Sequence, residues 1–305
     1  MLTNSQVLES KEIKQFKPYS LDLSIKPNPA NISLKVRKFV SNWVIFSALP
    51  LGNNSDPFIR DVIFRDGNII KTMTKDDLFF LLNCIYFSSQ FLSEDKVTKT
   101  VRRLYELSTS IKLHLSKEWE GQRKGLGGWP GTKEILLYLL IRKYYPEVVV
   151  ETGVAQGVSS MFILQAMDDN DHGSLVSIDL PNFNQDGQIN SDGVLDGVYV
   201  KERLGVGWVV PDFLRRRWKL ILGDSKVELQ NLNIHPDLFF HDSDHSYQHM
   251  MYEYIWGLEN LTPGGIIISD DIGWNSSFND FLKHYKSKVK KIYSRHGVGI
   301  AGKIP

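Results

Sequence analysis

The residues that could carry chemistry in this sequence follow short apolar runs. The first such segment is VVVETGVAQGVSS, residues 148–160, in which β-branched residues run into Glu151, Gly153 and Gly157. Glycine lets a backbone turn sharply and approach a ligand closely, and a helix that follows presents free N–H groups. The segment therefore predicts a ligand-binding turn at the end of a strand.

The glycine spacing indicates which ligand this turn accepts. Gly153 and Gly157 are four residues apart with Ala155 between them, whereas the outer glycines of the dinucleotide fingerprint G-x-G-x-x-G are five apart. A carboxylate at this place repels a pyrophosphate but suits an ammonium group. Glu151 therefore favours an amino-acid ligand, and Ser159 is a further expected contact.

Two later strand ends carry residues that could bind further parts of the same ligand. The strand-like segment SIDL brings Asp179 to a strand end, where a carboxylate can accept both hydroxyls of a ribose. The segment LILGDS brings Asp224 and Ser225 to the next one, where they can bind an adenine edge. An amino acid, a ribose and a base together describe S-adenosylmethionine, the cofactor that we expect.

An acidic cluster follows the next two apolar segments, FFHDSDHSY and IISDD. Neighbouring strands of a sheet lie about 5 Å apart, so Asp242 is expected near Asp270 and Asp271. Carboxylates this close repel one another unless they are protonated or bridged by a cation. Oxygen ligands favour Mg2+, with Mn2+ and Ca2+ as alternatives. Single acids at these positions also serve as turn or helix caps, which is the structural alternative.

The same segment offers candidate proton acceptors. A hydroxyl is a poor nucleophile near neutral pH, and His245 or Asp244 could remove its proton. Asp242 is also expected to contact the cofactor. His241 lies one step earlier in the apolar strand, so its side chain should point to the opposite face and pack there.

The elements that position these residues alternate from Thr132 onward. Helical and strand-like segments take turns as far as residue 271, which is typical of a Rossmann-like, doubly wound, mostly parallel sheet covered on both faces. A helix and two short strands close the chain, with an antiparallel strand at the C-terminus. Residues 131–305 are therefore expected to form the cofactor-binding domain, and residues 1–130 a helical region with few strand signals, acting as substrate lid or dimer interface.

Two connecting segments stand out. Residues 182–210 are too many for an ordinary connection, so this segment is expected to line or cover a site. Residues 121–133 contain five glycines and form either a hinge or a lid in which Trp129 stacks on a ligand.

Composition narrows the partners. The chain has 36 basic and 35 acidic residues among 305, so a nucleic-acid partner is not expected. Cys84 is the one cysteine and can form neither an internal disulfide nor a thiolate cluster. The polar start lacks a secretion signal, and the longest apolar stretch, residues 78–92, is too short for a bilayer. We expect a cytoplasmic protein, without a membrane partner, that acts on a small hydroxylated molecule, with a homodimer as a further expectation.

From about Gly128 to Asp280 the sequence resembles class I S-adenosylmethionine-dependent methyltransferases, especially the metal-dependent O-methyltransferases of sugars and of polyketide or peptide natural products. The segments that carry this resemblance are VVVETGVAQGVSS, VSIDL, GWVVPDFLRRRWKLILGDS, DLFFHDSDHSY and LTPGGIIISDDIG. The resemblance implies a metal ligand at Asp242 and an acidic pair of ligands at Asp270 and Asp271. Ala155 departs from the pattern, because a glycine is common there.

Three alternatives stay open on the sequence. The first is an NAD-dependent oxidoreductase, which the glycine spacing disfavours. The second is a metal-independent methyltransferase that uses His245 as base. The third is a non-catalytic or differently reactive protein of the same fold, such as a hydroxylase-like relative.

Overall fold

The computed structural model of the chain describes residues 60–63, 70–73, 80–81, 83–84, 87–88, 91–118, 130–183, 188–295 and 297–305. Its centre is a seven-stranded sheet with the order β10-β11-β9-β8-β3-β4-β7. The strands are β3 (Val148–Thr152), β4 (Ser174–Asp179), β7 (Trp218–Leu222), β8 (Leu238–His241), β9 (Ile266–Ser269), β10 (Val289–Arg295) and β11 (Val298–Lys303). The first five pair in parallel, and β11 is antiparallel to both of its neighbours. The predicted fold class is therefore confirmed.

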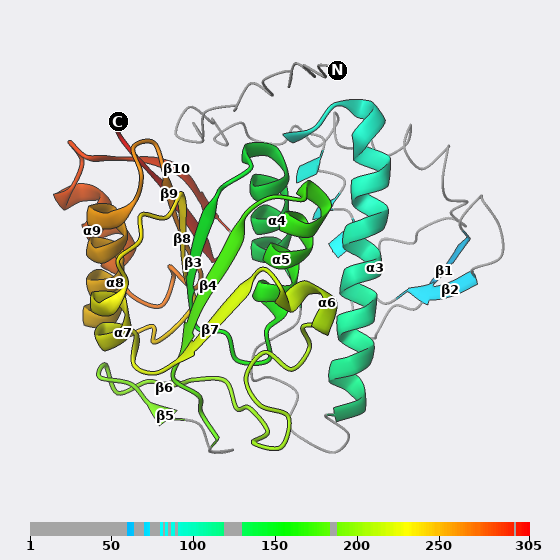
Figure 1. Cartoon of the computed structure of the whole chain (residues 1–305), viewed down its shortest axis with the longest axis horizontal. Helices are drawn as coiled ribbons and strands as arrows, with labels where there is room; N and C mark the ends of the chain where they lie inside the picture. The colour runs from blue at the N-terminus through cyan, green and yellow to red at the C-terminus, as the bar shows by residue number, and fades with distance from the viewer. Residues whose placement is uncertain are drawn as a thin grey trace, which may run out of the picture.

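Helices cover both faces of this sheet (Figure 1). One side carries α3 (Glu94–Glu118), α4 (Thr132–Tyr144), α5 (Val158–Asn170) and the short α6 (Asp212–Arg215); the other carries α7 (Ser225–Asn231), α8 (Tyr247–Asn260) and α9 (Ser277–His284). Val149 and Phe240 belong to one apolar cluster, whereas their neighbours Val150 and Phe239 belong to a second. Because successive side chains alternate between the faces, burial on both sides explains why these strands are apolar without interruption.

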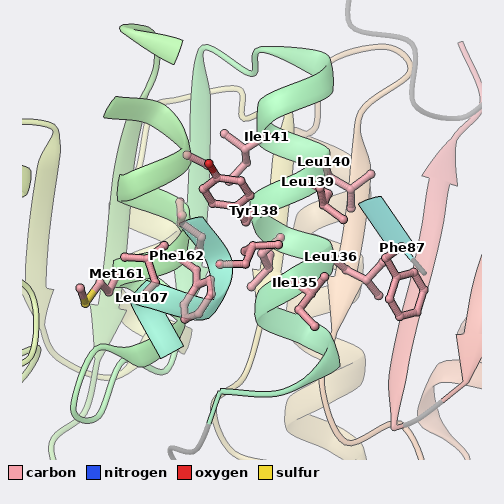
Figure 2. Packing of buried hydrophobic residues seen from close by; sticks show 14 of the residues in the cluster. Phe87, Leu107, Ile135, Leu136, Tyr138, Leu139, Leu140, Ile141, Met161 and Phe162 are labelled. Atoms are coloured by element: carbon pink, nitrogen blue, oxygen red, sulfur yellow. The ribbon is translucent and has the colours of Figure 1, made fainter. Parts of the chain in front are cut away.

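The N-terminal part shares the first of these cores. Leu107 of α3 and Phe87 belong to the same buried cluster as α4 and α5, as Figure 2 shows. The aromatic residues Phe80 and Tyr105 are buried in it as well. The substrate and dimer roles expected for residues 1–130 stay predictions.

The helical expectation for residues 1–130 needs one correction. Strands β1 (Arg60–Ile63) and β2 (Ile70–Met73) form a short antiparallel hairpin. The apolar spacing of residues 32–49 also predicts a helix, but this segment lies outside the described residues, as do Phe79 and Trp129 of the glycine-rich linker. None of the helices described is both long enough and apolar enough to cross a bilayer.

The long segment after β4 contains a second hairpin, formed by β5 (Gln188–Ile189) and β6 (Leu195–Asp196). Further along, Gly207 donates its N–H to Ala155 O, and Val209 donates to Gln156 O. The segment therefore lies over the turn that follows β3, as its length led us to expect.

Candidate active site

The turn after β3 has the predicted conformation. Gly153 and Gly157 have φ of +81° and +91°, values that favour glycine. A Cβ at position 153 would lie 1.9 Å from the backbone oxygen of Asp242, so this turn presses against the end of β8. Ala155, between the two glycines, also has a left-handed φ of +47°.

Glu151, which we expected to bind an ammonium group, faces the protein interior, and that expectation stays a prediction. Its side chain is fully buried, and its carboxylate accepts hydrogen bonds from the hydroxyls of Ser159, Ser160 and Ser177, each at 2.6 Å. Burial raises the pKa of Glu151, although the three hydroxyls oppose that shift. The carboxylate thus ties β3 to β4 and α5, and the cofactor contact expected of Ser159 stays a prediction.

Asp179 lies at the carboxyl end of β4, as predicted. Its Oδ2 accepts the backbone N–H groups of Val154 and Ala155 at 2.7 and 2.9 Å, which fixes the glycine turn. Burial raises the pKa of this carboxyl. The ribose contact expected of Asp179 stays a prediction.

Asp224 and Ser225 have local roles at the start of α7. Asp224 is exposed and caps the helix by accepting the N–H of Lys226. Ser225 is buried, and its hydroxyl bonds Glu253 Oε1 at 2.5 Å and His249 Nε2 at 2.9 Å. Their adenine contacts are untested predictions.

Glu253 of α8 joins the layers beneath these strand ends, a role that the sequence analysis missed. Its fully buried carboxylate accepts hydrogen bonds from five side chains: Thr152, Ser225, His241, Ser243 and His249. A glutamate inside the apolar helix segment MMYEYIW was the available signal. As expected, His241 is fully buried rather than exposed to the carboxyl edge.

The acidic cluster forms at the edge where it was predicted, but a lysine lies within it. Lys133 Nζ donates to Asp242 Oδ2 at 2.7 Å and also to Asp270 Oδ2. Burial alone would lower the pKa of Lys133, but these two carboxylates raise it well above its ordinary value. Burial alone would likewise raise the pKa of Asp270, and the ammonium holds it below the ordinary value.

This arrangement does not confirm the predicted magnesium site. Within the described ranges, no group of three or more His, Cys, Asp or Glu side chains is arranged to hold a metal ion. Asp242 and Asp270 share the single ammonium of Lys133, and the side chain of Asp271 is 42% exposed. The residues present therefore do not fit a metal ion as they stand.

His245 is the best-positioned candidate base. Its Nδ1 lies 3.3 Å from Asp196 Oδ2, and its backbone N–H donates to the same oxygen at 2.8 Å. Its Nε2 is buried without a hydrogen-bond partner in the described part of the chain, and lies 3.9 Å from carboxylate oxygens of both Asp242 and Asp271. Because a carboxylate only accepts, Asp196 favours the tautomer with a proton on Nδ1 and a lone pair on Nε2.

Nearby carboxylates raise the pKa of His245. Burial alone would lower the pKa of His245, but the hydrogen bond of Asp196 and the charges of Asp242, Asp196 and Asp271 raise it. Burial likewise opposes ionisation of Asp196, yet the bonds from His245 lower the pKa of that carboxyl to about 2. Asp196 belongs to β6 and was not predicted as a site residue; only the length of its segment pointed to the site.

Two aromatic rings also pack against the imidazole of His245. Trp274 lies over His245 with 5.0 Å between ring centroids, and His241 meets it edge to face at 5.5 Å. Trp274 remains 44% exposed. Asp244, the second candidate base, accepts the N–H of Ser246 just before α8, as in an Asx turn.

The fold and site define a class. The parallel sheet reverses its strand order beside β3, and in such sheets ligands bind beyond the carboxyl ends near that point. The glycine turn, Asp179, Asp242 and His245 all lie there. Residues 150–272 match the family model of a methyltransferase domain. This part of the chain is therefore similar to methyltransferase domains.

Solved structures give a weaker likeness. An O-methyltransferase of tomaymycin synthesis from Streptomyces achromogenes is 17% identical, with 76% of this chain and all of that chain covered, at a TM-score of 0.42. An O-methyltransferase from Bacillus cereus is 13% identical over 75% of this chain and all of that one, at 0.45. The methyltransferase PaMTH1 of Podospora anserina is 14% identical over 70% of this chain and 97% of that one, at 0.44. Among curated proteins, none matches the sequence significantly.

Proposed function

We propose that this protein transfers a methyl group from S-adenosylmethionine to a hydroxyl of a small molecule, with His245 as general base. The observation that carries the proposal is the buried Nε2 of His245. It has no partner in the described residues and lies at the carboxyl edge of a methyltransferase domain. Buried polar atoms are rarely left unpaired, so a ligand hydroxyl is the partner that this nitrogen requires.

The reaction follows from these groups. His245 Nε2 removes the hydroxyl proton while the oxygen attacks the methyl carbon, the O–C bond forms, and the S–C bond breaks to leave S-adenosylhomocysteine. Such an in-line displacement depends on positioning, and Asp196 supplies it by holding the ring through Nδ1. Asp179 would bind the ribose of the donor beyond the glycine turn.

The acceptor that we propose is a natural product with apolar surface, such as a polyketide or a peptide. The segment that carries Asp196 has several exposed apolar side chains, and Trp274 is half-exposed. Those of the segment are Leu180, Phe183, Ile189, Val194 and Leu195. A purely polar sugar would leave these side chains in water. An apolar acceptor would cover them and gain free energy from their burial.

The experiment has two arms. Calorimetric titration with S-adenosylmethionine and with NAD+ should show binding of the sulfonium donor alone. A screen with methyl-labelled donor over hydroxylated compounds then identifies an acceptor for kinetics.

With that acceptor, His245→Asn should lower kcat by about 10²- to 10⁴-fold, the contribution of a positioned base, without changing donor affinity. Asp244→Asn is the matched control and should keep wild-type kcat, because asparagine forms the same turn with the Ser246 N–H as aspartate does. Preferential binding of NAD+, or an unchanged kcat in His245→Asn, would refute the proposal.

A further inference from the structure

Lys133 occupies an unusual position in α4. It is the second residue of this helix, where the positive end of the helix dipole disfavours a cation. Its side chain is only 22% exposed. A lysine in this place needs nearby negative charge to offset both costs, and Asp242 and Asp270 supply it.

The three side chains form a closed charge cluster. The exposed fractions of the Asp242 and Asp270 side chains are 18% and 15%, so water screens their repulsion little. A single ammonium between them satisfies one oxygen of each carboxylate. Removing one partner of a buried ion pair leaves an uncompensated charge, which costs several kcal/mol. The cluster therefore holds α4 against the ends of β8 and β9.

The same position excludes a second cation. A divalent ion bridging Asp242 and Asp270 would bind their oxygens at about 2.0–2.6 Å, in the space that the Lys133 ammonium fills. Two positive charges in one partly buried site would also repel each other. Metal and ammonium are thus alternatives here rather than neighbours.

We propose that Lys133 takes the place of a divalent cation at this edge, so that the intact site binds no Mg2+ or Mn2+ and methyl transfer proceeds without them. Lys133 acts as a positioning residue, since its ammonium bonds one oxygen of each carboxylate beside His245 and aligns both. The link to catalysis rests on the proposed methyltransferase function; the claim about metal binding does not.

Metal binding itself provides the test. Mn2+ is titrated into the wild-type protein and into Lys133→Ala, and free Mn2+ is followed by electron paramagnetic resonance. Wild type should show no saturable binding below millimolar Mn2+. Lys133→Ala should bind one ion at least tenfold more tightly, because Asp242, Asp270 and Asp271 then lack a cation.

Lys201→Ala is the matched control. Lys201 is 21% exposed and pairs with Glu118 away from this edge, so its removal should leave Mn2+ binding at the wild-type level. Lys133→Met keeps the apolar stem of the side chain and replaces Lys133→Ala if the alanine variant does not fold.

Micromolar binding of one Mn2+ to the wild-type protein, lost in Asp270→Asn, would overturn the inference. A folded Lys133 variant that binds Mn2+ no better than wild type would also overturn it. Neither readout needs the methyl donor or the acceptor, so a failure here leaves the proposed methyl transfer standing, and the reverse holds too.

Discussion

Ala155 combines a left-handed backbone with a Cβ atom in the turn that follows β3. This conformation costs an L-residue about 1–2 kcal/mol. Replacement with glycine removes the cost but gives the unfolded chain more freedom, worth about 0.4–1 kcal/mol. Ala155→Gly should therefore raise the free energy of unfolding by about 0.5–1 kcal/mol, measured by urea denaturation.

A second alanine provides the control for this prediction. Ala166 is buried inside α5 with a helical backbone, so Ala166→Gly should lower the free energy of unfolding by about 1 kcal/mol or more. If both variants lose stability alike, Ala155 carries no strain and our reading of the turn is wrong.

Single residues also show where sequence reasoning reached its limit. Strand-end positions were predictable for Glu151, Asp179, Asp242 and Asp270, because apolar runs mark where each strand stops. The hydrogen-bond partners of these carboxylates could not be predicted, because a carboxylate at a strand end can point toward a ligand or into the protein. Glu151 points inward because three serine hydroxyls converge on it.

At the scale of elements, α8 carries a pH-dependent contribution to stability. Burial alone would lower the pKa of His249, but the hydrogen bond and charge of Glu253, together with the charge of Asp244, raise it above its ordinary value despite Lys226. A raised folded-state pKa stabilises the protein fully below the unfolded pKa of about 6.5. That contribution is lost as the pH rises through the folded-state pKa.

His249→Gln keeps a hydrogen-bond donor near Glu253 but cannot carry the charge. The difference in Tm between wild type and this variant should be largest near about pH 6 and shrink toward about pH 9. His241, whose pKa is lowered chiefly by burial, stays in both proteins, so its opposite trend largely cancels. Thermal scans across this range make the comparison, and a difference that grows with pH would contradict it.

Helices and strands could be predicted from the sequence where their apolar residues are continuous or regularly spaced. The helices and strands from Thr132 to Lys303 have continuous or regularly spaced apolar residues, and the structure has them close to the expected positions. The hairpins β1-β2 and β5-β6 are too short to set a pattern, and both were missed. Asp196 was missed for the same reason, since a two-residue strand gives no sign that it meets His245.

At the scale of the whole molecule, the predicted sheet brought the carboxylates of Asp242 and Asp270 to one edge, as expected. The charge balance at that edge also depends on Lys133, which belongs to a helix packed on the sheet. Lys133 lies 109 residues before Asp242 and 137 before Asp270 in the chain. Only the packing of α4 on the sheet shows that its ammonium meets them. The sequence therefore predicted the acidic cluster but not the ammonium that meets it.

The central claim is that a sulfonium donor lies at the carboxyl edge of this sheet with its methyl group toward His245. The most direct test is a crystal structure of the complex with S-adenosylhomocysteine. We predict density along the Gly153–Gly157 turn, with the ribose at Asp179 and the sulfur on the side of Asp242 and His245. Density at another edge of the sheet, or none at saturating ligand, would contradict the account.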